Sequence, residues 1–163
     1  MRSIQAVRGI RDLPLEQLRG AGVLGLILDL DNTLVPPGSD EVPGETRRFL
    51  ADLRRLGLLS VIVSNTRSER ADQIGQAMGL PVVSRARKPF GRGYRRALGL
   101  MRLPADKVVA VGDQLLTDGA GAWRQGMPLF LVDPLSRREA LLPRLARPLD
   151  RILRRLLFGR QGV

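Results

Sequence analysis

Short apolar runs alternate along this chain with segments whose apolar residues recur at helical spacing. The runs are continuous and too short for helices, so they predict five buried strands, at residues 23–31, 58–65, 81–84, 107–113 and 127–134. The amphipathic segments predict helices at residues 45–57, 67–79, 89–101 and 116–126, with Pro89 opening the third. This alternation predicts an α/β fold: a parallel sheet of about five strands with helices on both faces.

Charge divides the chain near Pro134. The length of 163 residues suits one domain, and the net charge is +11. Residues 134–163 hold eight arginines against two acids, so this segment carries more than half of the excess. We therefore expect an α/β body at residues 1–134 and a basic tail at residues 135–163, with an amphipathic helix from about residue 149 to residue 158.

The chain contains no cysteine and no histidine. This composition excludes disulfides, thiolate metal sites, cysteine nucleophiles and serine–histidine–aspartate triads. Any chemistry must therefore rest on carboxylates, hydroxyls or lysine. Apolar stretches are too short for a membrane span or a signal core, so we expect a cytoplasmic protein.

Three of the predicted strands end in polar groups. These groups are Asp29 and Asp31 on the first strand, Ser64 and Asn65 on the second, and Asp113 on the fourth, with Asp118 shortly after it. In parallel α/β sheets, ligands bind at the carboxyl ends of the strands. The groups therefore predict one site at that edge of the sheet.

Asp29 and Asp31 are two residues apart, so in extended backbone their side chains point the same way. One carboxylate can attack an electrophile while the other moves a proton to or from the leaving group. Two like charges so close either raise the pKa of a carboxyl group or bind a cation, and an all-oxygen site suits Mg²⁺. The alternative is that the aspartates only cap a helix or form a turn, which leaves the other strand ends unexplained.

Two weaker signals accompany the aspartates. The Ser64 hydroxyl and the amides around it can hold a phosphate oxygen, although Ser-Asn after a strand is also typical of a plain turn. Lys88 can reach an anionic nucleophile and a transferring phosphoryl group, although a loop lysine is often only solvated.

Four segments together carry a resemblance to a known family: "DLDNTLV" at residues 29–35, "VSN" at 63–65, "RKP" at 87–89 and "VGDQLLTD" at 111–118. In order and spacing they resemble the four motifs of the haloacid dehalogenase (HAD) superfamily. Residues 5–135 also resemble the YqeG-type branch of its subfamily IIIA phosphatases, which is related to the mitochondrial phosphatidylglycerophosphate phosphatase. The resemblance implies phosphoryl transfer.

The resemblance also implies roles for single residues. Asp29 would be the nucleophile that forms an aspartyl-phosphate, and Asp31 would be the general acid and then the base. The implied Mg²⁺ ligands are Asp29, Asp31 through its backbone carbonyl, Asp113 directly, and Asp118 either directly or through water.

Four more residues are implied around the substrate phosphate. Lys88 would neutralise the charge of Asp29 and of the phosphoryl group, and Ser64 would bind the phosphate. Asn65 and Thr33 would hold the loops and contact phosphate.

The spacing of the motifs bears on the substrate. Neither the interval from Asp31 to Ser64 nor that from Ser64 to Lys88 has room for an inserted cap domain. An uncapped site suits a phosphate carried on something large, such as a lipid headgroup, a nucleic-acid end or a protein. A basic cluster beside the site can attract such an anionic partner or form a solvated helix face; it comprises Arg85, Arg87, Lys88, Arg92, Arg95 and Arg96.

The leading interpretation is a phosphatase of phosphatidylglycerophosphate or another phosphoester at an anionic membrane surface. The tail would dock on lipid, pack on the domain or contact a second copy. Nucleic acid is a less favoured partner because aromatic residues make up only 4% of the chain. The alternatives are a phosphatase of nucleic-acid ends or small phosphometabolites, and a non-enzymatic scaffold for RNA or protein. The sequence leaves the oligomeric state open.

Overall fold

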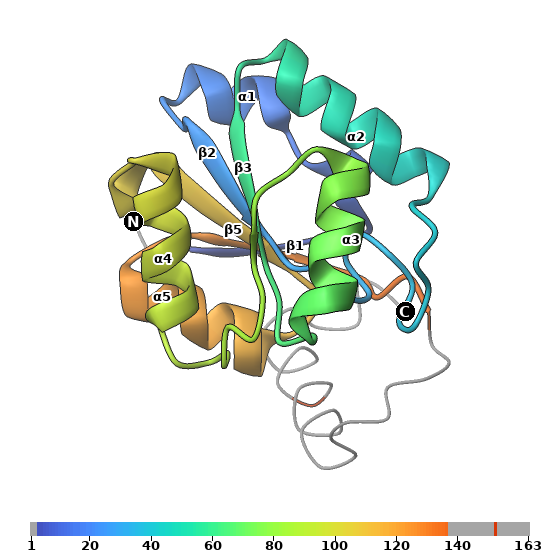
Figure 1. Ribbon diagram of the computed structural model, residues 1–163. Helices are drawn as coiled ribbons and strands as arrows, with labels where there is room; N and C mark the ends of the chain where they lie inside the picture. Colours follow the sequence, from blue (N-terminus) through green and yellow to red (C-terminus); the bar gives the residue numbers. More distant parts are fainter. Residues whose placement is uncertain (1–2, 137–151, 153–163) are drawn as a thin grey trace.

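Within residues 3–136, six parallel strands form one sheet, in the order β1-β6-β5-β2-β3-β4. Figure 1 shows the sheet with helices around it. The structure is a computed structural model and describes residues 3–136 and Ile152. The strands are β1 (Ile4–Val7), β2 (Gly25–Leu28), β3 (Leu59–Val63), β4 (Val82–Val83), β5 (Val108–Gly112) and β6 (Leu129–Val132). The helices are α1 (Leu15–Gly20), α2 (Gly44–Arg55), α3 (Ser68–Met78), α4 (Arg92–Met101) and α5 (Ala120–Gln125).

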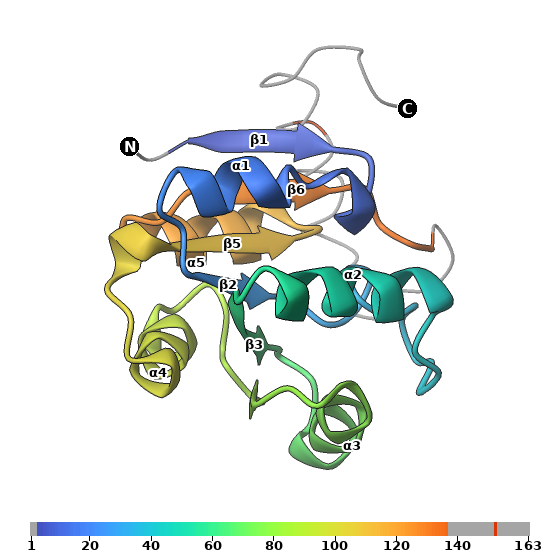
Figure 2. The ribbon, with the colours of Figure 1, turned by 90° about the horizontal axis from the view of Figure 1, so that it is seen from above.

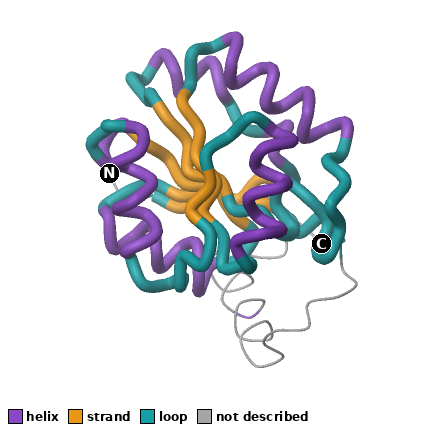
Figure 3. Tube along the Cα trace, viewed as in Figure 1, coloured by secondary structure: helices purple, strands orange, loops and turns teal. Residues whose placement is uncertain are grey.

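Helices cover both faces of the sheet, and the strands lie between them (Figure 3). Figure 2 shows α4 on the opposite side of the sheet from α2 and α3. Because side chains alternate along a strand, Leu28 of β2 belongs to the same buried cluster as Phe49 of α2, whereas its neighbour Ile27 belongs to the cluster of Tyr94 on α4. Both faces of the central strands are therefore buried, as continuous apolar runs indicate.

The predicted α/β class is confirmed, and each of the five predicted strands contains one observed strand, β2 to β6. The sheet has one strand more than predicted, because β1 pairs with β6 at the edge, from Ile4 opposite Leu129 to Val7 opposite Val132. The side chains of β1 are mostly exposed, so no apolar pattern marks it in the sequence. Main-chain pairing, which side-chain type hardly reveals, holds it in the sheet.

Two helices differ from their predicted bounds. α4 begins at Arg92 and not at Pro89, because residues 87–90 form a turn that is closed by a 2.8 Å bond from the Phe90 amide to the Arg87 carbonyl. The predicted helix at 116–126 is divided into a π-helical turn, Leu115–Gly119, followed by α5. The wide turn arises because the Gly119 amide donates to the carbonyl of Gln114, five residues back.

The intervals between the motifs hold only elements of the sheet and its helices. Residues 32–87, all of which are described, form a loop, α2, β3, α3 and β4, so no cap domain is inserted there, as predicted. Across residues 3–136 and at Ile152, no helix combines the length and apolarity needed to cross a bilayer. The predicted tail helix at 149–158 lies outside the described residues, apart from Ile152.

Candidate active site

Asp29 directly follows β2, in the middle of the sheet. Its amide donates to the Val111 carbonyl on β5 at 2.9 Å, which keeps its backbone aligned with the neighbouring strand. The residue is only 8% exposed, and one carboxylate oxygen accepts a 3.3 Å hydrogen bond from Thr33 Oγ1. The sheet thus holds a nearly buried carboxylate at the edge where the sequence predicted a site.

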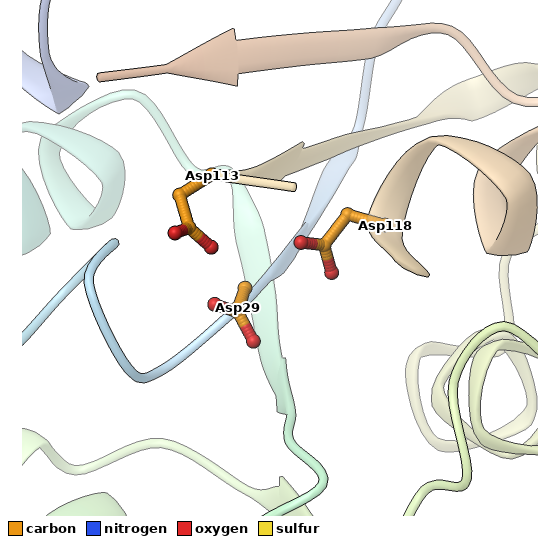
Figure 4. Close-up of side chains that lie close together, drawn as sticks. All are labelled: Asp29, Asp113 and Asp118. Atoms are coloured by element: carbon orange, nitrogen blue, oxygen red, sulfur yellow. The ribbon is translucent and has the colours of Figure 1, made fainter. Parts of the chain in front are cut away.

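Asp113 and Asp118 lie beside Asp29. Asp113 directly follows β5, Asp118 comes from the π-helical turn, and the three carboxylates converge in Figure 4. All three are buried, and one oxygen of each lies within 4.8 Å of the others. Buried carboxylates this close repel one another unless positive charge compensates them, and a set of hard oxygen donors suits Mg²⁺. The residues present therefore fit a magnesium ion.

A wide turn and a glycine bring Asp118 into this cluster. The amides of Asp118 and Gly119 both donate to the Gln114 carbonyl, at 2.9 and 3.2 Å. In return, the Gln114 amide donates to Asp118 Oδ2 at 3.2 Å. A β-carbon on Gly112 would lie 2.4 Å from Asp118 Cγ, so only glycine leaves room for the carboxylate.

Lys88 is buried against the same carboxylates. Its Nζ donates to Asp29 Oδ1 and, at 2.7 Å, to Asp118 Oδ1. Asn65 fixes its backbone on both sides, because the Lys88 amide donates to Asn65 Oδ1 at 2.7 Å and Asn65 Nδ2 donates to the Lys88 carbonyl at 3.3 Å. The end of β3 thus positions the lysine that faces the end of β2.

Burial and charge act in opposite directions on this pair. Burial raises the pKa of Asp29 from 3.8 to about 7, with Lys88 lowering it and Asp118 raising it. Burial alone would lower the pKa of Lys88, but Asp118 and Asp29 outweigh it and hold that pKa well above its ordinary value of 10.5. Lys88 therefore remains an ammonium ion and favours the anionic form of Asp29.

The carboxylate of Asp31 does not belong to this group of three carboxylates and has partners of its own. The backbone leaves the extended conformation directly after it, with a φ of 67° at Asn32. Asp31 accepts hydrogen bonds from Thr66 Oγ1 and, at 2.8 Å, from Arg70 Nη1. These two partners, from the segment that follows β3, fix its direction.

The remaining predicted residues line the same loops. Ser64, buried directly after β3, accepts a 3.1 Å bond from the Thr66 amide through its Oγ. Asn32, in the loop that follows Asp31, also holds the segment after β6. The Leu135 amide donates to the Asn32 carbonyl at 3.0 Å, and the Ser136 amide donates to Asn32 Oδ1 at 3.2 Å.

Sequence reasoning missed three residues that contact the site. Arg70 and Thr66 bind Asp31, and the buried Tyr94 donates to the carbonyl and to Oδ1 of Asp118, each at 3.3 Å. Burial raises the pKa of Tyr94 well above its ordinary value, and Asp118 adds to this effect, so its hydroxyl stays a donor. Tyr94 is the only tyrosine of the chain, but nothing in its sequence context separates it from an ordinary core residue.

The chain is similar in sequence to two curated proteins. It is 33% identical over 145 residues to a Bacillus subtilis (strain 168) protein named "Probable phosphatase YqeG", a match that covers 89% of this chain and 84% of that protein. It is 34% identical over 140 residues to "Phosphatidylglycerophosphate phosphatase 1, chloroplastic" of Chlamydomonas reinhardtii. That match covers 80% of this chain but only 52% of the algal protein.

A family model matches part of the chain, and a solved structure shares its fold. The model, described as HAD-hydrolase-like, matches residues 85–157. The fold is similar to that of D,D-heptose 1,7-bisphosphate phosphatase from B. bronchiseptica, complexed with magnesium and phosphate, with a TM-score of 0.55 and 18% identity over 66% of this chain and 79% of that one. The chain belongs to the HAD-like hydrolases, as its motifs predicted. Within this family it is a phosphomonoester hydrolase.

Proposed function

We propose that this phosphatase depends on Mg²⁺, acts through an aspartyl-phosphate on Asp29, and hydrolyses phosphatidylglycerophosphate or another phosphomonoester at a membrane surface. One observation carries the chemistry: the Lys88 ammonium contacts Asp29 and Asp118 within a buried cluster of three carboxylates. A catalytic site rather than a structural ion pair explains why so many like charges are buried at one sheet edge.

The reaction has two steps that use the same residues. An Asp29 oxygen attacks phosphorus, the bond from phosphorus to the substrate oxygen breaks, and Asp31 gives that oxygen a proton. Water then attacks the aspartyl-phosphate, Asp31 takes a proton from the water, and the bond between Asp29 and phosphorus breaks to release inorganic phosphate. Asp31 thus ends in its starting protonation state.

Positive charge stabilises the phosphoryl group in both steps. Asp29, Asp113, Asp118 and the backbone carbonyl of Asp31 would hold Mg²⁺, which supplies electrostatic stabilisation to the phosphate oxygens when bound. Lys88 adds a second positive charge and favours the anionic form of Asp29.

The loops around the nucleophile complete the phosphate site. Ser64, buried beside these loops, would donate its hydroxyl proton to the phosphate. Thr33 holds the Asp29 carboxylate, and Asn65 holds the backbone of Lys88.

Two observations support a membrane-borne substrate. The algal relative, 34% identical, is named as a phosphatidylglycerophosphate phosphatase. In addition, residues 32–87 form no cap, so the site is open to a headgroup that stays anchored in a bilayer. We expect the protein to work in the cytoplasm, peripherally at the membrane.

The test compares Mg²⁺-dependent phosphate release by wild type and Asp29→Asn on three substrates: phosphatidylglycerophosphate in vesicles, an aryl phosphate and a 3′-phosphorylated oligonucleotide. Fast release from the vesicles that requires Asp29 supports the whole proposal. Release only from the aryl phosphate or the oligonucleotide would support the phosphatase chemistry and contradict a lipid substrate. Equal rates for the two proteins would remove Asp29 from its role.

A further inference from the structure

Two aromatic side chains are largely exposed beside the active site. Phe90 is 64% exposed and follows the catalytic loop two residues after Lys88, and Trp123 on α5 is 60% exposed. The chain has only four Phe, one Trp and one Tyr, so these two form a third of its aromatic residues. An exposed aromatic ring does not contribute the stabilisation that its burial would give. The exposure of both rings therefore points to a binding role rather than to a role in folding.

Phe90 and Trp123 belong to one surface, although they are far apart in the sequence. Arg124, next to Trp123, donates from Nη1 to the carbonyl of Pro89, next to Phe90, at 3.1 Å. A β-carbon on Gly91 would lie 2.3 Å from Gln125 Nε2, so the start of α4 touches the end of α5. In Figure 1 the loop that leads into α4 runs alongside α5.

Exposed arginines lie on the same two segments of the chain as this aromatic pair. We call the surface the aromatic–arginine rim, and its members are Phe90, Trp123, Arg87, Arg92, Arg95 and Arg124. The sequence has no Asp or Glu at residues 85–105 or 119–132, so no acid of these two segments offsets the arginines. The rim therefore combines exposed aromatic rings with positive charges that no acidic residue of the same segments neutralises.

We propose that the aromatic–arginine rim docks the enzyme on an anionic lipid bilayer. Aromatic rings settle at the level of lipid headgroups, and arginines pair with lipid phosphates while their stems cover apolar surface. Since Phe90 is two residues from Lys88, docking places the active-site edge against the membrane. The purpose of docking rests on the proposed function, because a lipid phosphate must reach the buried Asp29. Binding of the rim to a bilayer does not depend on that function.

The only tryptophan of the chain reports directly on this surface. Titrating the full-length protein with vesicles of pure phosphatidylglycerol is expected to shift the Trp123 emission to shorter wavelength, whereas phosphatidylcholine vesicles leave it unchanged. Phe90→Ala is expected to weaken vesicle affinity about tenfold, because a ring no longer enters the interface. Arg92→Gln is expected to weaken it by about threefold to tenfold, and less at high salt.

Matched variants distinguish docking through the rim from non-specific binding to vesicles. Leu100→Ala removes a side chain that is 52% exposed at the other end of α4, and Arg48→Gln removes an exposed arginine of α2; both are expected to bind vesicles like wild type. Equal binding by Phe90→Ala and wild type, or sedimentation with vesicles without a change in Trp123 emission, would overturn the proposal. Tighter binding to single-stranded RNA than to vesicles, with loss in Phe90→Ala, would also overturn it.

The Asp29→Asn variant separates this proposal from the proposed function. It lacks the nucleophile but keeps the rim, so docking predicts vesicle binding equal to that of wild type. If wild type hydrolyses the aryl phosphate but does not bind vesicles, docking fails and the chemistry stands. If vesicles bind through Phe90 but no phosphoester is hydrolysed, the docking surface stands and the proposed function fails.

Discussion

Arg70 Nη1 lies 2.8 Å from Asp31 Oδ1, and the same guanidinium reaches two more groups. Its Nε donates to Asp40 Oδ1 at 3.0 Å, and its Nη2 donates to the Ser39 carbonyl at 2.6 Å. One side chain of α3 thus connects the proposed acid–base residue to the loop between the nucleophile and α2. We infer that Arg70 positions Asp31 without touching the substrate.

Arg70→Gln is expected to lower kcat about tenfold with little change in KM, because a misdirected Asp31 fails mainly in the transition state. The loss should be larger for an alkyl phosphate than for p-nitrophenyl phosphate, since only the poor leaving group needs a proton. Steady-state kinetics on both substrates measures the difference. Arg67→Gln removes an exposed arginine nearby and serves as the control. Equal losses on both substrates would assign Arg70 a purely structural role.

Asp29→Asn is expected to abolish turnover but to change the free energy of unfolding by less than about 1 kcal/mol at pH 7.5. The reason is that Asn avoids the burial of a negative charge, while Lys88 keeps its 2.7 Å contact with Asp118. Urea unfolding in EDTA gives the stability, and phosphate release in Mg²⁺ gives the rate. Severe destabilisation would mean that the pair with Lys88 is structural.

The raised pKa of Asp29 predicts a pH dependence for the metal-free protein. Below about pH 3.8 both the folded and the unfolded state hold the proton, and the stabilising contribution is complete; it is lost as pH rises through about 7. The unfolding free energy of wild type should therefore fall relative to Asp29→Asn between these values, by up to about 1.4 kcal/mol per pH unit. Urea unfolding of both proteins in EDTA across this range tests it. Parallel curves would contradict the raised pKa.

Lys88→Met leaves Asp29 and Asp118 buried without their ammonium partner. We expect the free energy of unfolding to fall by about 3 kcal/mol without metal, and turnover to be lost. Mg²⁺ supplies positive charge to the same carboxylates, so it should raise the Tm of this variant more than that of wild type. Lys107→Met, at the chain's other lysine, is the control. Insensitivity of Lys88→Met to Mg²⁺ would argue against a metal at this cluster.

Gly112→Ala tests the position of Asp118. The added β-carbon would meet Asp118 Cγ at 2.4 Å and force the carboxylate out of the cluster. We expect Mg²⁺ affinity, measured by calorimetry, to fall about tenfold or more, because one of three acidic ligands is misplaced. Gly99→Ala, where the added carbon meets nothing within 4 Å beyond its neighbours and its own helix backbone, should bind Mg²⁺ like wild type. Unchanged affinity in Gly112→Ala would exclude Asp118 from the metal site.

The sequence predicted the sheet and much of the site because both depend on local pattern. Buried strands appear as short apolar runs, and the carboxyl ends of parallel strands must meet at one edge, which brought Asp29, Ser64 and Asp113 to neighbouring strands. The sequence did not predict the edge strand β1, because main-chain pairing, and not side-chain burial, holds it in the sheet.

The roles of Arg70 and Tyr94 were not predicted, for a different reason. Their roles come from tertiary contacts with Asp31 and Asp118, which are 39 and 24 residues away in the sequence.

The hydrogen bonds from Leu135 and Ser136 to Asn32 matter for anyone who shortens this chain. Composition alone places the end of the body at Pro134, but a protein cut there would lose both amides. Loss of activity in such a truncation would therefore report on the cut itself, and a fair test of the basic tail should retain Ser136 and begin its deletion after it.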